Sequence, residues 1–175
     1  RNESAVGAGP TGARAAGAEV TLIDLRDFPM PLFDQDDESA TGQPEHALRL
    51  RAILAQHQGF LIAAPEYNSS ITPLLKNTID WVSRPTPHEA ALVHFTGRVA
   101  GLMSASPGAL GGLRGLVHVR SILGNIGVIV LPEQVAIPTA HNAFDEQGNL
   151  KEATQQANAE KIGARVAEAV AKLHS

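Results

Sequence analysis

Residues 59–73, Gly59-Phe-Leu-Ile-Ala-Ala-Pro-Glu-Tyr-Asn-Ser-Ser-Ile-Thr-Pro73, join a short apolar run to the expected start of a helix. The run Gly59–Ala64 predicts a strand that is buried on both faces of a parallel sheet. Thr72 is a suitable N-cap, and Pro73 suits the first helical position because its missing N–H would be unpaired in any case. Open α/β sheets bind cofactors at turns of this kind, between the carboxyl end of a strand and a helix.

The alternation of strand and helix continues on both sides of this stretch. Further strands are predicted at Glu19–Asp24, Arg98–Ala105 and Val128–Leu131. Apolar residues recur at helical spacing in four segments, 47–54, 71–82, 111–125 and 150–173. This order predicts a parallel sheet with helices on both faces, joined by right-handed connections. No repeat, linker or second domain is visible, so residues 1–175 are expected to form one domain.

Composition excludes several classes of protein. The chain has 175 residues, of which 43% are hydrophobic, and this favours a globular domain over disorder. A net charge of −4 provides no basic surface for nucleic acid or for an anionic membrane. No apolar run approaches the ~20 residues that a membrane-spanning helix needs, and no signal peptide is visible. The absence of cysteine excludes disulfides and thiolate chemistry. We therefore expect a cytoplasmic protein.

The segment Pro65–Pro85, Pro-Glu-Tyr-Asn-Ser-Ser-Ile-Thr-Pro-Leu-Leu-Lys-Asn-Thr-Ile-Asp-Trp-Val-Ser-Arg-Pro, resembles the NADPH-dependent FMN reductase family. The resemblance implies that the turn lines a flavin, through Pro65, Glu66, Tyr67 and Asn68. Backbone N–H groups and the side chains of Asn68 and Ser69 are suited to bind the edge of the ring and leave one face open. On turn chemistry alone, an ordinary strand-to-helix turn is an equal alternative, and the length of the match favours the flavin site.

A second turn, Ser104-Ala-Ser-Pro-Gly-Ala-Leu-Gly-Gly-Leu-Arg-Gly115, follows the strand predicted at Arg98–Ala105. Glycines let a backbone approach a flat ligand closely, and successive N–H groups can bind carbonyl oxygens. The turn resembles the family's third loop, Ser-x-Ser-x-Gly-x-x-Gly-Gly, and the positions that match it are Ser104, Ser106, Gly108, Gly111 and Gly112. Taken alone, a glycine-rich turn is more often a tight entry to a helix. It is neither a Walker loop nor a nucleophile elbow.

The N-terminus lacks the buried first strand that this class of domain should have. Family members carry a phosphate-binding turn, Gly-Ser-x-Arg-x-x-Ser-x-Asn, after that strand. Arg1 and Ser4 match its Arg-x-x-Ser core, with Val6 where the family has Asn; counting back from Gly17 instead places the motif's Asn at Asn2. We prefer the first alignment, so the sequence is expected to begin inside this loop. Pro10 and the glycines around it predict a weak first helix.

The remaining polar clusters favour ordinary structural roles. Asp34–Glu38 has calcium-like spacing but lacks the loop glycine and the bidentate Glu, so we expect a solvated acidic loop within 28–42. No His-x-x-x-His pair occurs among the seven histidines, and no metal site is predicted. His88 and His94 are a weaker possibility for docking a nicotinamide or an acceptor. Trp81 is expected to be a core or interface anchor, and Asp80 is spaced to pair with Arg84.

The resemblance implies a flavodoxin-like fold with a five-stranded parallel sheet of order 2-1-3-4-5 and FMN at the carboxyl ends of the strands. It implies an enzyme in which NADPH or NADH reduces FMN, which then reduces a small-molecule acceptor such as a quinone, azo compound, flavin or metal oxyanion. No catalytic acid or base is predicted. A homodimer or homotetramer is expected, with no nucleic-acid or membrane partner. The alternatives are a flavodoxin-like electron carrier and a truncated or apo binding module.

Overall fold

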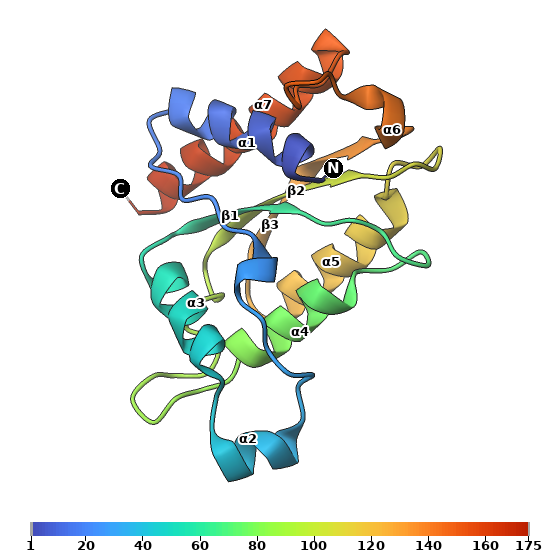
Figure 1. Cartoon of the computed structure of the whole chain (residues 1–175). Helices are drawn as coiled ribbons and strands as arrows, with labels where there is room; N and C mark the ends of the chain where they lie inside the picture. Colours follow the sequence, from blue (N-terminus) through green and yellow to red (C-terminus); the bar gives the residue numbers. More distant parts are fainter. Residues whose placement is uncertain (1, 175) are drawn as a thin grey trace.

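The sheet of the protein is parallel and lies between two layers of helices (Figure 1). A computed structural model describes residues 2–174, with side chains from Gly7 onward. Within these residues the sheet has three strands in the order β1-β2-β3: β1 (Gly59–Ala63), β2 (Val99–Ala105) and β3 (Ile129–Ile137). Gly59 is paired with Val99, and Val99 with Ile129, so all three strands point the same way. The predicted parallel α/β architecture is confirmed.

Helices cover both faces of this sheet, as the strand–helix alternation predicts. One face carries α1 (Asn2–Ala15) and α7 (Ala153–Leu173). The other carries α3 (Glu45–Ala55), α4 (Pro73–Val82) and α5 (Leu113–Asn125). Three short helices lie in the connections: η1 (Leu25–Asp27), α2 (Gln35–Thr41) and α6 (Ala140–Ala143). No helix within residues 2–174 is long and apolar enough to cross a membrane.

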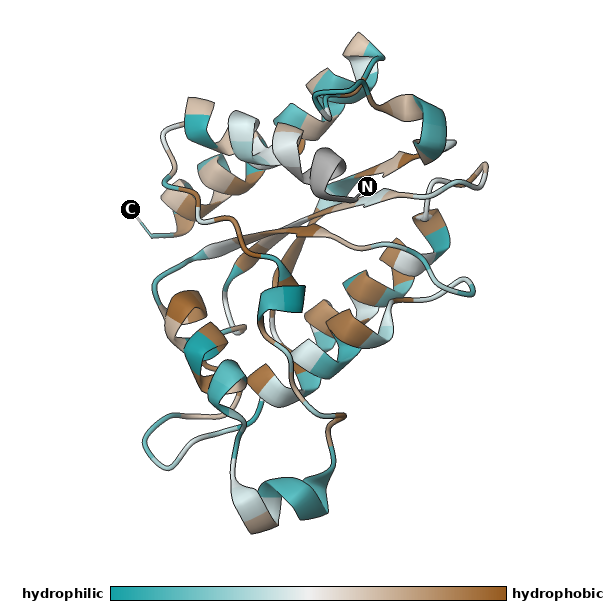
Figure 2. Ribbon diagram, in the orientation of Figure 1, coloured by the Kyte–Doolittle hydropathy of each residue, from teal (hydrophilic) through white to brown (hydrophobic). Residues whose placement is uncertain are grey.

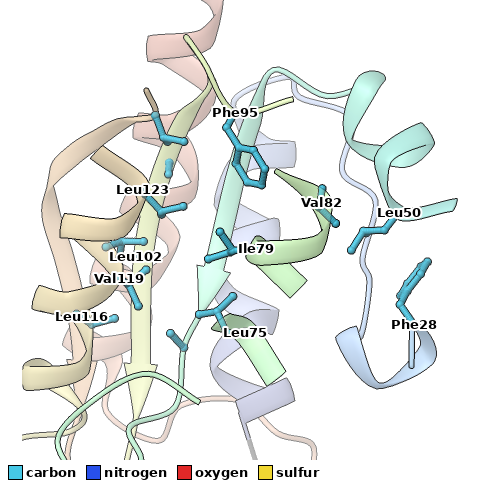
Figure 3. Close-up of a cluster of buried hydrophobic side chains, with 13 residues drawn as sticks. Phe28, Leu50, Leu75, Ile79, Val82, Phe95, Leu102, Leu116, Val119 and Leu123 are labelled. Atoms are coloured by element: carbon cyan, nitrogen blue, oxygen red, sulfur yellow. The ribbon is translucent and has the colours of Figure 1, made fainter. Parts of the chain in front are cut away.

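Strand β2 is the centre of the core because its residues alternate between the two faces. Ala100 and Leu102 pack towards α3, α4 and α5, where Ile79 and Val119 meet them (Figure 3). On the other face Met103 packs against Ile162 of α7. Every residue of β2 is buried, and apolar segments gather on the strands and on the sheet-facing helices (Figure 2). A continuous apolar strand is what a parallel sheet covered on both faces requires.

The prediction of a strand at Glu19–Asp24 is wrong, because the structure has no strand there. Residues 18–24 are extended but form no ladder, and Leu22 and Ile23 remain 58% and 40% exposed. An extended segment becomes a strand only when a neighbour satisfies its N–H and C=O groups. In the order 2-1-3-4-5 that neighbour is strand one, and no described strand pairs with β1 on that side.

The last strand and the acidic loop also differ from the sequence-based expectations. The strand predicted at 128–131 extends to Ile137, because the ladder shifts register between Ala100 and Leu102 and Pro132 lies in the irregular part. Proline is tolerated in a sheet at such a bulge. In the acidic loop, the carboxylate of Asp34 accepts a hydrogen bond from the N–H of Asp36 at 2.8 Å and caps α2. The acidic run therefore begins a helix, whose dipole favours negative charge there.

Helix α1 forms over 14 residues although its glycines and Pro10 predict a weak helix, and Gly9 and Gly12 lie at close contacts with the rest of the fold. A Cβ on Gly12 would lie 1.8 Å from the backbone oxygen of Glu160, and one on Gly163 would lie 1.8 Å from that of Gly9. The two helix backbones are thus in direct contact. Packing of α1 on α7 and the sheet outweighs the helix-weakening effect of glycine and of the buried Pro10.

Replacing Gly12 with alanine should therefore destabilise the fold, since the new methyl group cannot fit against Glu160. We expect a loss of roughly 3 kcal/mol in the free energy of unfolding, the upper range for overpacking, measured by urea denaturation. Gly7→Ala is the matched control in the same helix: a Cβ there meets no described atom within 4 Å, so stability should rise by up to about 1 kcal/mol. Equal effects of the two substitutions would contradict the close contact.

Candidate functional site

The two turns singled out in the sequence lie at the same edge of the sheet. Residues 64–72 follow the carboxyl end of β1, and residues 106–112 follow that of β2, its parallel neighbour. Both turns lie on the right of Figure 1, on the side where α1 begins. They are adjacent in space, because a Cβ on Gly112 would be 3.6 Å from the Cβ of Glu66. This is the place where open α/β sheets hold ligands.

The first turn is a tight two-residue reversal. Tyr67 and Ser70 exchange both backbone hydrogen bonds at 3.0 Å, and the two residues between them have positive φ, 49° at Asn68 and 66° at Ser69. Asparagine tolerates this left-handed conformation better than most residues. The N–H groups of Asn68 and Ser69 make no hydrogen bond within the described part of the chain. Tyr67 is 59% exposed. The turn thus offers two free backbone donors beside an exposed aromatic ring.

The second turn is shaped by Ser104. This residue is fully buried at the end of β2, and its hydroxyl donates to the carbonyl oxygen of Gly111 at 2.6 Å. Gly111 and Gly112 have φ of 60° and 93°, and a Cβ on either would lie within 2.8 Å of protein atoms. Ser104, Gly111 and Gly112 therefore fix the path of the loop, and their side-chain positions face the protein.

Gly108 differs from the other glycines of this turn. Among the atoms that the structure describes, the only one within 4 Å of a Cβ placed there is the Oγ of Ser106, at 3.9 Å. Gly108 and the residues around it are exposed, apart from the half-buried Ser106, whose Oγ accepts a weak bond from Gly108 N at 3.4 Å. The loop thus leaves open space at Gly108, next to a turn with free N–H donors. These features fit a planar, hydrogen-bonding ring such as a flavin.

Glu66 has a different surrounding from the one expected for a ring-lining residue. Its Oε1 accepts hydrogen bonds from Nη2 and Nε of Arg114, at 2.6 and 3.1 Å, and its Oε2 accepts one from the N–H of Gly115 at 3.1 Å. The N-cap of α5, Gly112, has no side chain that could satisfy this amide, so Glu66 does so from the neighbouring turn. The hydrogen bond from Arg114, assisted by that from Gly115, lowers the pKa of Glu66 despite its burial.

The N-terminal half of the expected site is only partly described. Arg1 lies outside the described residues, and Ser4 is within α1 but its side chain is not among those described. The two alignments of the phosphate loop therefore both stay predictions. The start of α1 does lie at the same side as the two turns (Figure 1).

Some residues that the sequence suggested for the site lie away from the two turns. His94 is 4% exposed and lies before the amino end of β2, at the sheet edge opposite the two turns, beside Arg51 and Glu89. Burial, with the nearby charge of Arg51, lowers its pKa. The idea that His94 docks a nicotinamide at the flavin is therefore wrong. Among the side chains described, from Gly7 onward, no group of three or more His, Cys, Asp or Glu could hold a metal ion.

The residues around Trp81 are also rearranged. Trp81 is 1% exposed, and its Nε1 donates to the oxygen of Pro31 at 2.8 Å, so the expected anchoring role is confirmed. The predicted pair of Asp80 and Arg84 is wrong: the carboxylate of Asp80 binds Lys76. Arg84 turns instead to Glu38, near α2. Trp81 and Arg84 thus hold the loop between 28 and 42 against α4 and take no part in the turns.

Sequence reasoning missed three residues of α5 that contact the first turn: Arg114, Gly115 and His118. The ring nitrogen Nδ1 of His118 lies 2.9 Å from Oγ of Ser70. Glu66 and Arg114 are 48 residues apart in the chain. One feature of the sequence could have indicated this contact. A helix whose N-cap is glycine has no capping side chain, so another segment must accept hydrogen bonds from its first N–H groups.

Comparisons with known proteins agree with this geometry. The family model for NADPH-dependent FMN reductases matches residues 4–142. The chain is 38% identical over 135 residues to an NAD(P)H-dependent FMN reductase of Pseudomonas aeruginosa, covering 77% of this chain and 69% of the relative. It is 35% identical over 133 residues to a probable NADPH:quinone oxidoreductase of Oryza sativa subsp. japonica, covering 74% and 62%. The chain thus spans about two thirds of the length of these relatives.

Two solved structures share the fold. The flavoenzyme NAD(P)H:(acceptor) oxidoreductase FerB of Paracoccus denitrificans superposes with a TM-score of 0.79 at 23% identity, over 98% of this chain and 90% of that one. A flavodoxin from the domain Archaea gives a TM-score of 0.65 at 10% identity, over 97% and 90%. The flavodoxin-like character of the α/β fold is confirmed.

The lowered pKa of Glu66 predicts a pH-dependent contribution to stability. A carboxyl group whose pKa is lower in the folded than in the unfolded chain stabilises the fold fully above the unfolded value, and this contribution is lost as the pH falls through the folded value. The unfolded value is near 4.5. In Glu66→Gln the single amide oxygen can accept from Arg114 or from the N–H of Gly115 but not from both, and the negative charge is lost, so the variant should be less stable than the parent at neutral pH. The difference should shrink below pH 4.5, as followed by urea denaturation. A difference that is constant with pH would contradict the ion pair.

Proposed function

The chain belongs to the NADPH-dependent FMN reductase family, an oxidoreductase family, and from this premise we propose that it takes electrons from NADPH or NADH through FMN to a small-molecule acceptor. The observation that supports this proposal is the pairing of two turns at one sheet edge, one with unused backbone donors and one with open space at Gly108. Residues 1–175 would form one FMN-binding domain.

Different residues would contact different parts of the cofactor. When bound, FMN supplies the hydride-accepting chemistry, and the protein supplies binding, orientation and electrostatics. The N–H groups of Asn68 and Ser69 would bind the polar edge of the ring, with Pro65 and Tyr67 as a wall beside it. The backbone at Gly108, with Ser106, would lie against the ring, since only hydrogen occupies the Cβ position there. Arg1 and Ser4 are proposed for the phosphate. No side chain is assigned as acid or base.

A quinone is the acceptor class that we favour, because one of the relatives is named an NADPH:quinone oxidoreductase. A flat conjugated acceptor also suits a site that stays open beside the exposed ring of Tyr67. Azo compounds, free flavins and metal oxyanions remain further acceptors of the same proposal. The five-stranded order 2-1-3-4-5 and the cytoplasmic location also stay predictions.

The protein is further proposed to associate with a second copy of itself through α4 and α5. Large apolar side chains stay exposed on both helices: Leu74 at 40%, Leu113 at 40% and Val117 at 57%. Exposed apolar side chains that gather on one side commonly mark an interface. The start of α5 also contacts the first turn of the candidate site, so this surface would adjoin the cofactor.

The first test is whether the protein binds FMN and whether the bound FMN is reduced. We expect purified protein, reconstituted with FMN, to show flavin absorbance that bleaches on anaerobic addition of NADPH or NADH and returns on addition of a quinone.

Gly108→Val tests the place of the ring. The valine side chain would fill the space proposed for the ring, so FMN should bind at least about tenfold more weakly, and a tenfold loss corresponds to about 1.4 kcal/mol of binding free energy. The melting temperature of the apoprotein should not change, since little surrounds this Cβ position. Bound FMN that no nicotinamide reduces would favour the electron carrier, and protein that cannot be reconstituted would favour the apo binding module.

The second test concerns self-association. Sedimentation velocity should show a dimer or tetramer, and Val117→Lys should shift it to a monomer, because a charge would be buried in an apolar contact. Leu32→Lys is a control, since Leu32 is 78% exposed and lies in the loop before α2. A monomeric parent protein would contradict this part of the proposal.

A further inference from the structure

Helix α5 holds the first turn at both of its ends. At the start of the turn, Glu66 accepts hydrogen bonds from Arg114 and from the N–H of Gly115. At its end, the Oγ of Ser70 and the Nδ1 of His118 share a hydrogen bond of 2.9 Å. We call these five residues the α5 clamp. Between the two attachments lie Asn68 and Ser69, whose backbone N–H groups are free.

The turn also lies directly on the helix backbone, at Gly115. A Cβ on this residue would be 3.2 Å from the carbonyl oxygen of Ser70, 3.4 Å from the Cβ of Glu66 and 3.5 Å from its Cα. Glycine is one of the least favourable residues inside a helix. This contact explains why a glycine stands near the start of α5. Any side chain at Gly115 would push residues 66–70 away from the helix.

The clamp is strong enough to fix the position of the turn. The side chain of Glu66 is 7% exposed, and the pKa of its carboxyl is held below the ordinary value, first by the hydrogen bond from Arg114. The carboxylate is therefore charged at neutral pH, and charge-assisted bonds of this kind are about twice as strong as neutral ones. The fork of Arg114 adds directionality, since it contacts Oε1 through both Nε and Nη2.

We propose that Arg114, Gly115 and His118 are positioning residues for the cofactor, and that the start of α5 sets the place of the free N–H groups in the first turn. The inference rests on the proposed function, because those N–H groups are the donors assigned to the ring edge. Hydrogen bonds weaken steeply when donor and acceptor are displaced. A shift of the turn by a few tenths of an ångström therefore weakens binding of the ring without loosening the protein.

Gly115→Ala separates positioning from stability. The new methyl group forces the turn back by a few tenths of an ångström, while alanine favours the helix more than glycine does. We expect FMN to bind roughly fivefold to tenfold more weakly, the value of about one hydrogen bond, with a changed absorbance spectrum of the bound flavin. The matched control is Gly124→Ala in the same helix, where a Cβ meets nothing within 4 Å. It should bind FMN as the parent does.

Arg114→Ala provides a second, independent test, because the side chain of Arg114 is 56% exposed and its loss should cost no more stability than the ion pair with Glu66 contributes. We expect weaker FMN binding and a shifted midpoint potential of the bound flavin, with partial rescue in Arg114→Lys, which keeps the charge but not the fork. Arg165→Ala is the control: Arg165 is also exposed and also pairs with a carboxylate, Glu168, but lies on α7. Its FMN affinity and potential should match those of the parent.

The two proposals fail in different ways. Parent-like FMN affinity, spectrum and potential in both Gly115→Ala and Arg114→Ala would overturn the positioning role and leave the proposed function standing. Equal weakening in Gly115→Ala and Gly124→Ala would also overturn it, because the effect would then come from the helix in general. A parent protein that binds no FMN overturns the proposed function and the positioning role with it.

Discussion

The N-terminus of α5 has no capping side chain of its own, and the organisation of the site follows from that constraint. The helix begins at Gly112, which has positive φ and must be glycine because Ser104 lies against it. The N–H of Gly115, near the start of α5, therefore needs an acceptor from another segment. The carboxylate of Glu66, in the turn after β1, accepts its hydrogen bond. One carboxylate thereby joins the ends of two strands, and the two turns become a single structural unit.

Close backbone contact is the second theme of the fold. On one face of the sheet, Gly12 and Gly163 allow α1 and α7 to touch backbone to backbone; on the other, Gly115 allows the first turn to lie on α5. In both places glycine weakens a helix locally and strengthens an association between elements. Gly108 is different, because among the described residues only the Oγ of Ser106, at 3.9 Å, comes near a Cβ placed there. The same residue type thus serves packing at three positions and leaves open space at one.

Much of the fold could be predicted from the sequence because the signals are local. The cap at Thr72 with Pro73, the apolar runs of β1 and β2 and the periodicity of α4, α5 and α7 each depend on neighbours a few residues away. Glu19–Asp24 is the instructive failure, since its sequence suits a strand but no described residue pairs with it. The predicted bond between Asp80 and Arg84 failed because other charges compete for both residues: Lys76 lies four residues before Asp80 on the same helix, and Glu38 reaches Arg84 once the chain has folded.

The sequence by itself determined the alternation of strands and helices, the place of the two turns and the family to which they point. Only the tertiary structure decided what each residue of those turns does. It directed Glu66 to α5 rather than to the open space at Gly108, engaged the hydroxyl of Ser104 with Gly111, and brought Arg114 and His118 to the first turn. The physical reason is distance along the chain. Caps and periodicities act within a few residues, whereas the contacts of Glu66 join segments 48 residues apart, and their geometry exists only after β1 and β2 have paired.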